Sequence, residues 1–141
     1  MSEMRVWQSD VIKKLRNQLG DEDGALVREI IQLYLVQARD LLAQLRVASR
    51  DADEYQIRGL AHSLKGSTAT VGGDRLAAVC DRIEHASSAE LASPDIWQDA
   101  QDEFELLAAE LERHRPRRGA VRAGRTHYLA GEGLSVRRFP A

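Results

Sequence analysis

The sequence predicts an all-α protein, an antiparallel up-and-down four-helix bundle with a short additional helix at its N-terminus. Apolar residues make up 43% of the 141 residues but aromatic residues only 5%, which favours an interior of Leu, Ile, Val and Ala. Long runs of Val, Ile and Thr, which are typical of sheets, are absent from the sequence. Apolar residues instead recur at helical spacing between residues that start or stop helices. Amphipathic helices with short connections bury such stripes by packing as a bundle.

Helix start and stop signals predict five helical segments within the first 114 residues. The segments begin near Ser9, at Asp21, at Asp51, after Gly73 and at Ser93. The stop signals are Gly20 for the first segment, Gly72 and Gly73 for the third, and Ser87 and Ser88 for the fourth. Asp51 with Glu54 three residues later resembles a capping box, which predicts the start of the third helix.

The apolar positions of each helix predict the side that faces the core. At about 100° per residue, those of the third helix lie within about 40° of one direction. They are Ile57, Leu60, Ala61, Leu64, Thr68 and Val71. The stripe of the second helix is Leu26, Ile30, Leu33, Tyr34, Leu41 and Leu45. The fourth and fifth helices contribute Leu76, Val79, Cys80 and Ile83, then Trp97, Ala100, Phe104, Leu107 and Leu111.

The distribution of charge divides the chain into two parts. Residues 1–114 carry 13 Lys and Arg against 21 Asp and Glu, a net charge of −8, and form the predicted bundle. Residues 115–141 carry seven Arg and one Glu, a net charge of +6, and are rich in Gly without a sustained period, so we interpret them as a C-terminal extension. Clustered positive charge attracts acidic proteins, nucleic acids or anionic lipids, and it can also fold back on the acidic bundle. Because aromatic residues are sparse in the extension, we do not expect nucleic acid as a partner.

Several classes of protein are disfavoured by what the sequence lacks. The single Cys80 forms no internal disulfide, and the N-terminus has no apolar signal core, so we expect a cytoplasmic protein. No apolar stretch approaches the roughly 20 residues that a membrane span requires. A GxxxxGK[ST] loop is absent, and neither His85 nor His114 has metal-ligand spacing to another His or Cys. We therefore expect neither a metal site nor a bound cofactor, and the initial Met favours a free-standing protein over a fragment.

The third helix carries a histidine on the side opposite to its core face. His62 lies about 140° from the direction of Ile57 and is therefore predicted to point to solvent. Its neighbours on the exposed face are Tyr55, Gly59, Gly66 and Ala69, and Arg58 and Lys65 lie on the flank. This angle excludes a histidine buried in the core.

Two glycines leave the helix bare on either side of the histidine. Gly59 comes three residues before His62 and Gly66 four residues after it. Each glycine costs a helix about 0.5–1 kcal/mol relative to alanine, and close approach of another macromolecule would offset that cost. Lys65 can place an ammonium group near whatever the imidazole carries. The alternative is an ordinary surface histidine with glycines placed by chance.

The residues around His62 also resemble a known signature. The run His62-Ser63-Leu64-Lys65-Gly66-Ser67 is followed by Gly72 and then by Leu76, Cys80 and Glu84. This pattern resembles the signature of histidine phosphotransfer (HPt) domains of bacterial multistep phosphorelays. The resemblance extends more loosely from about Trp7 to His114 and does not include the basic extension.

The resemblance implies a role for each matching residue. His62 would accept a phosphoryl group, Lys65 would contact that group, and Gly66 would let a receiver domain come close. Glu84 would bond the imidazole, although a solvated helix carboxylate is an equal alternative. The docking face would comprise Tyr55, Arg58, Gly59, Gly66, Ser67 and Ala69. The implied partners are the receiver domains of a hybrid sensor kinase and of a response regulator.

The expected activity is that of a phosphocarrier without catalysis of its own. Phosphoryl transfer usually uses Mg²⁺ held by carboxylates, and because none cluster around His62 in the sequence, the Mg²⁺ would belong to the partner's receiver domain. Two other functions remain open. A pure interaction module would bind a signalling partner through the same face without being phosphorylated. An enzyme that uses His62 as a base or metal ligand would need convergent partners, which the sequence lacks.

Overall fold

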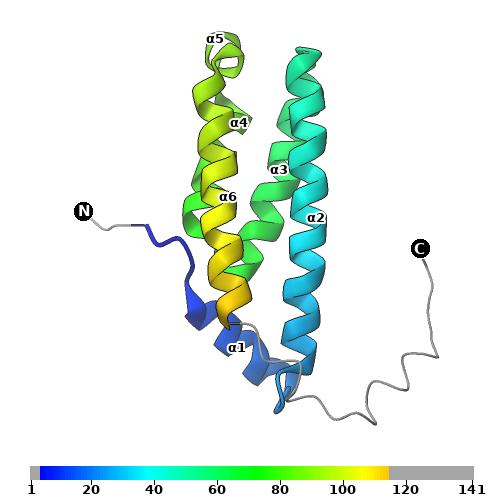
Figure 1. Cartoon of the computed structure of the whole chain (residues 1–141), viewed down its shortest axis with the longest axis vertical. Coiled ribbons are helices and arrows are strands. Elements are labelled where there is room, and N and C mark those ends of the chain that lie inside the picture. The colour runs from blue at the N-terminus through cyan, green and yellow to red at the C-terminus, as the bar shows by residue number, and fades with distance from the viewer. Residues whose placement is uncertain (1–3, 115–141) are drawn as a thin grey trace, which may run out of the picture.

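The computed structural model describes residues 4–114, which form six helices (Figure 1). They are α1 (Ser9–Leu19), α2 (Ala25–Arg50), α3 (Glu54–Val71), α4 (Asp74–His85), α5 (Ser88–Ala92) and α6 (Pro94–His114). Helices α2, α3, α4 and α6 run side by side as an up-and-down bundle, α1 lies across one end and α5 sits at the other. The predicted fold class is confirmed. The predicted basic extension, residues 115–141, lies outside the described residues.

The helix ends follow the expected chemistry with two corrections. The residue that caps α3 is Asp53, whose carboxylate accepts a hydrogen bond from the backbone N–H of Gln56 at 3.2 Å, so the capping box expected at Asp51 is wrong. Helix α2 begins later than predicted, at Ala25. The buried Asp21 precedes the helix, and its carboxylate accepts a hydrogen bond from the backbone N–H of Val27 in the first turn of α2 at 2.8 Å. The acidic run before α2 therefore caps this helix without forming part of it.

Helix α5 was not predicted from the sequence. The fourth helix ends just before Ser87 and Ser88, where a break was predicted, but Ser87 then caps a single helical turn in which Ser87 and Glu90 form a capping box. Leu91 is its buried residue, and Trp97 of α6 donates its indole N–H to the carbonyl of Leu91 at 2.9 Å. Five residues are too few to show a helical period, which is why the turn escapes a periodicity argument.

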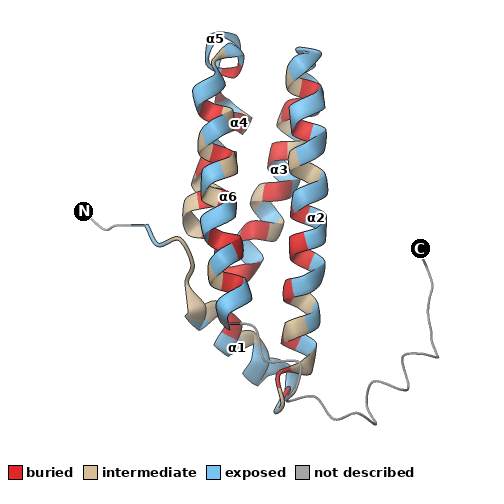
Figure 2. Ribbon diagram, viewed as in Figure 1, coloured by how far each residue is buried: buried red, intermediate tan, exposed pale blue. Residues whose placement is uncertain are grey.

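The core lies between the four long helices, where buried positions face inward (Figure 2). The stripes predicted for α3 and α4 are buried or half-buried throughout, and Cys80 is a core residue. The stripe predicted for α2 is partly wrong, because Leu26 is 47% exposed and Leu33 66% exposed. Their neighbours fill the core instead, namely Val27, Ile31, Leu35 and Ala38. Helix α2 carries apolar residues on more than one side, and packing against its neighbours decides which of them is buried.

One polar pair in this core ties α2 to α3. The hydroxyl groups of Tyr34 and Thr68 are 2.8 Å apart, and both side chains are buried. Burial raises the pKa of Tyr34 well above its usual range because the phenolate would lose its hydration. The pair therefore remains a neutral hydrogen bond that joins α2 to α3 inside the core.

A tight turn at Gly72 and Gly73 brings α4 back along α3. Gly72 has a left-handed backbone with a φ of 89°, and a Cβ atom there would lie 2.6 Å from the carbonyl oxygen of Gln8. A Cβ atom on Gly73 would lie 2.6 Å from Leu107 Cδ2. The backbone N–H of Gln8 donates to the carbonyl of Gly72 at 2.7 Å, so the segment before α1 holds the turn. The two glycines thereby set the register between α3 and α4.

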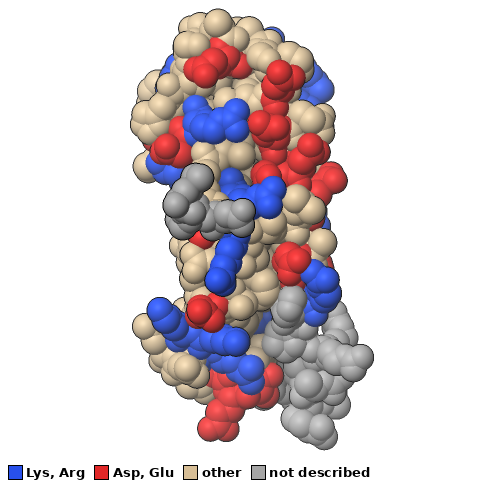
Figure 3. All heavy atoms as spheres, turned by 90° about the vertical axis from the view of Figure 1, so that its left-hand side faces the viewer, with Lys and Arg blue, Asp and Glu red and all other residues tan. Residues whose placement is uncertain are grey.

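Ion pairs join α4 to α6 on the outside of the bundle. Arg75 lies 2.7 Å from Glu103, and Arg82 lies 3.2 Å from Asp99. Figure 3 shows the face on which α4 and α6 lie, with basic side chains running down its middle beside acidic ones. Among residues 4–114, no helix is both long and apolar enough to cross a lipid bilayer.

Candidate functional site

His62 lies in the middle of α3 and its side chain is 69% exposed. This position agrees with the outward direction predicted from the helical angle. Ala61 and Leu64 on either side of it are fully buried, so α3 is held firmly by its opposite face. The imidazole is displayed from a rigid element.

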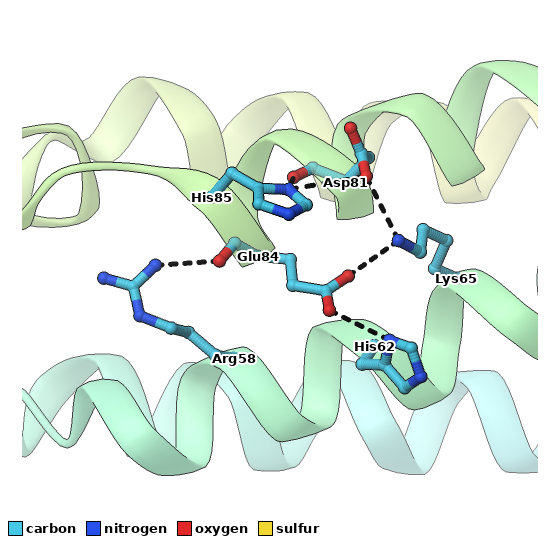
Figure 4. Close-up of polar contacts among 6 residues, drawn as sticks. All are labelled: Arg58, His62, Lys65, Asp81, Glu84 and His85. Carbon is cyan, nitrogen blue, oxygen red and sulfur yellow. Dashed lines mark hydrogen bonds and ion pairs between the residues drawn. The ribbon is translucent and has the colours of Figure 1, made fainter.

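Glu84 of α4 reaches the imidazole on the neighbouring helix α3 (Figure 4). Its Oε2 atom lies 2.9 Å from Nδ1 of His62. The Lys65 ammonium, with a smaller contribution from the His62 ring, holds the pKa of the Glu84 carboxyl below its usual range against the effect of desolvation. An ionised carboxylate only accepts hydrogen bonds, so in the neutral tautomer that fits this contact Nδ1 carries the proton and Nε2 keeps its lone pair.

Lys65 lies one turn after His62 and pairs with two carboxylates of α4. Its Nζ atom is 2.8 Å from Glu84 Oε1, an oxygen shielded from solvent, and 3.1 Å from Asp81 Oδ1. Glu84 first, and Asp81 second, raise the pKa of Lys65 above its usual range. Lys65 is therefore a cation at the pH of the cell, and it is anchored beside the histidine.

Arg58 has a structural contact where the sequence predicted a partner-binding residue. Its Nη1 atom donates to the backbone carbonyl of Glu84 at 2.8 Å, and its Nη2 atom lies 3.1 Å from Glu54 Oε1 (Figure 4 shows the first contact). The Ser88 hydroxyl first, and then Arg58, lower the pKa of Glu54. Arg58 thus ties the C-terminal end of α4 to α3, which supports the position of Glu84.

The remaining residues of the predicted docking face divide into open and inward positions. Tyr55 is 89% exposed, Ala69 is exposed, and a Cβ atom added at Gly59 or Gly66 would meet no atom within 4 Å. Ser67 is half-buried and its hydroxyl lies 3.3 Å from two carbonyl oxygens of its own helix. Four of the predicted residues therefore leave an open surface beside His62, whereas Ser67 is occupied within α3.

Sequence reasoning missed the contribution of Asp81 and His85. The Nδ1 atom of His85 lies 2.9 Å from the Asp81 carbonyl and 3.5 Å from its carboxylate. Together with Glu84, these residues form the one group in the described part of the chain whose ligand atoms lie close enough to hold a metal ion. Both carboxylates pair with the ammonium of Lys65, whose positive charge repels a metal cation, so this group does not favour a metal. The sequence pattern that could have revealed this group is the spacing of residues 81, 84 and 85, which places all three on one side of α4.

The chain is similar in sequence and in fold to known proteins. The family model of the Hpt domain matches residues 29–115. A curated relative, multistep phosphorelay regulator 1 of Schizosaccharomyces pombe, is 31% identical over 78 residues, which are 55% of this chain and 26% of that protein. The chain thus corresponds to about a quarter of the relative's length.

A solved structure has the same fold. It is the crystal structure of histidine-containing phosphotransfer protein B (HptB) from Pseudomonas aeruginosa PAO1, with a TM-score of 0.69 and 21% identity. The match covers 80% of this chain and 96% of HptB. At this identity the likeness concerns the fold alone, whereas the family match covers more than half of the chain, including His62, Lys65 and Glu84. The chain therefore belongs to the Hpt domain family.

Proposed function

We propose that His62 accepts a phosphoryl group from the aspartate of one receiver domain and passes it to the aspartate of another. The observation that carries this proposal is the exposed ring whose Nδ1 atom is bonded to Glu84, because Nε2 is then left as the nucleophile. The donor would be the receiver domain of a hybrid sensor kinase and the acceptor that of a response regulator. Since Cys80 is a buried free thiol, the exchange fits a reducing cytoplasm.

In this transfer, the bond that forms on His62 is matched by the bond that breaks on the receiver's aspartate. The lone pair of Nε2 forms the new P–N bond while the P–O bond to the receiver's aspartate breaks, and the electron pair of that bond stays on the aspartate carboxylate. The proton on Nδ1 remains in place, so the ring becomes an imidazolium whose charge the Glu84 carboxylate stabilises. The return step to the second receiver reverses these changes. This chain supplies the nucleophile, its orientation and one cation, and acts as a phosphocarrier.

We further propose that the partner supplies the Mg²⁺. This ion neutralises charge on the transferring phosphoryl group when it is bound. The carboxylates nearest to His62 do not fit that task, because Glu84 and Asp81 are both paired with Lys65. The acidic residues that hold the ion would therefore lie on the receiver domain, next to its aspartate.

The open surface around His62 is the proposed docking face. Tyr55 offers a large exposed ring, and Gly59 and Gly66 leave bare backbone one turn to either side of the histidine. A receiver must bring its phosphorylated aspartate in line with Nε2, which requires the two backbones to approach closely. Helical side chains at these two positions would obstruct that approach.

The decisive experiment is phosphotransfer from purified receiver domains encoded in the same genome, phosphorylated with acetyl phosphate. We expect an acid-labile, base-stable phosphoprotein from the wild-type chain and none from His62→Gln. The matched control is His85→Gln, which replaces an exposed histidine of α4 and should still be phosphorylated. Label on His62→Gln would refute the site. A receiver that binds both proteins equally without labelling either would favour the unphosphorylated interaction module.

A further inference from the structure

The ammonium of Lys65 is held by two carboxylates of α4, and one of them, Asp81, takes no part in orienting the imidazole. Figure 4 shows Lys65 lying between Asp81 and Glu84, with the Nζ atom directed at both. One of the N–H groups of the ammonium donates to Asp81 Oδ1, and Glu84 Oε1 lies at ion-pair distance from the same nitrogen. Glu84 also orients His62, whereas the carboxylate of Asp81 contacts Lys65 and His85.

The charges at the site are unbalanced because of Asp81. Glu84 and Asp81 contribute two negative charges against the single positive charge of Lys65. A phosphoryl group on Nε2 would add about two more negative charges to the ring that Glu84 contacts. The side chain of Asp81 is 55% exposed. Its carboxylate can therefore release Lys65 without becoming an unpaired buried charge.

We propose that Asp81 is a positioning residue that keeps Lys65 against α4 and thereby limits the fraction of His62 that is phosphorylated at equilibrium. The proposal rests on the proposed function of His62. In the resting protein Lys65 is shared by the two carboxylates, and the phosphoryl group has to compete with Asp81 for it. A phosphocarrier benefits from such competition, because a phosphoryl group bound too tightly would not pass to the second receiver.

The expected effect follows from the strength of exposed ion pairs. Asp81→Asn removes one negative charge and weakens the hold on Lys65, while Glu84 still orients His62. Exposed pairs of this kind change equilibria by a factor of about two to five. The ratio of phosphorylated to free His62 should rise by about that factor.

The test uses the full chain and potassium phosphoramidate, so that no partner protein is needed. The reagent's P–N bond breaks as Nε2 gains the phosphoryl group, and ammonia, added at a fixed concentration, leaves. Phosphorus NMR then gives the ratio of phosphorylated to free His62 at equilibrium. The matched control is Asp99→Asn, which removes an exposed carboxylate from an α4–α6 ion pair with Arg82.

A second readout separates a positioning role from a merely structural one. NMR titration of the Lys65 side chain should show a lower pKa in Asp81→Asn and an unchanged one in Asp99→Asn, and Asp81→Glu should restore both the Lys65 pKa and the equilibrium ratio. A ratio in Asp81→Asn equal to that in Asp99→Asn, or below that of the wild type, would overturn the inference while leaving His62 as the phosphorylated residue. Absence of phospho-His62 in the wild type would instead defeat the proposed function.

Discussion

Replacing Gly66 by alanine should make the protein more stable and the relay slower. The added methyl group would meet no atom within 4 Å, so the isolated chain has room for it. Alanine in a helix interior is favoured over glycine by about 0.5–1 kcal/mol. For a domain of this size, about 1 kcal/mol corresponds to a rise of roughly 4 °C in the melting temperature. The same methyl group would stand on the face where the receiver domain is expected to dock.

The expected loss of activity follows from close packing. An extra methyl group in a well-packed contact costs about 1–3 kcal/mol, which corresponds to a loss of roughly five- to 150-fold in kcat/KM for transfer from a phosphorylated receiver. Thermal unfolding and a transfer time course on the same preparation measure both effects. Asn17→Ala is the matched control, because it raises the helix propensity of an exposed position in α1 away from His62. This variant should gain stability and keep its transfer rate.

Replacing Gly73 by alanine should have the opposite effect on stability from replacing Gly66. A Cβ atom there would lie 2.6 Å from Leu107 and 2.8 Å from the methyl group of Thr68, so Gly73→Ala should lower the melting temperature. Unchanged transfer by Gly66→Ala would refute the idea that this glycine is kept for the receiver's approach. A loss of stability in Gly66→Ala would show that the open space around it is occupied.

Three further predictions concern the core and the carboxylates. Tyr34→Phe removes the hydrogen bond to Thr68 and should lower the free energy of unfolding by about 1 kcal/mol, measured by urea denaturation; an unchanged midpoint would show that this bond contributes no net stability. Burial raises the pKa of Cys80 to about 12, so the native thiol should resist a disulfide reagent at pH 8 and react only on unfolding; rapid native labelling would contradict its place in the core. Because Lys65 lowers the pKa of Glu84, the stabilisation from their pair is present above the usual pKa of a glutamate and lost as pH falls through the lowered value. Titration of the Glu84 carboxyl by NMR in Lys65→Met should therefore show a higher pKa than in the wild type, and equal values would remove Lys65 as the cause.

Much of the site was predictable because it depends on local geometry. The outward direction of His62 follows from its angle to the apolar residues of α3, and a helix has the same angle per residue in any fold. The stop at Gly72 follows from the left-handed backbone that glycine adopts at low cost. The start of α3 after Asp53 was missed because residues 51, 53 and 54 are all acidic and could each mark the N-terminal end of the helix. Only the observed hydrogen bond from Gln56 to Asp53 identifies the capping residue.

The contacts between helices needed the tertiary structure. Whether Glu84 reaches His62 depends on the register of α4 along α3, which the turn at Gly72 and Gly73 sets through its contacts with Gln8 and Leu107. Asp81 joins Lys65 for the same reason, although 16 positions separate them in the sequence. The buried side of α2 was also misassigned, because its apolar residues point in several directions.

The amino-acid sequence alone determined the helical class, the outward histidine and the bare helix on either side of it, since these follow from periodicity and from the properties of single residues. Only the tertiary structure decided which carboxylates surround that histidine, how its nearby lysine is held and which residues of α2 are buried. The physical reason is that such contacts depend on the packing of elements distant in the chain, which local propensities do not encode.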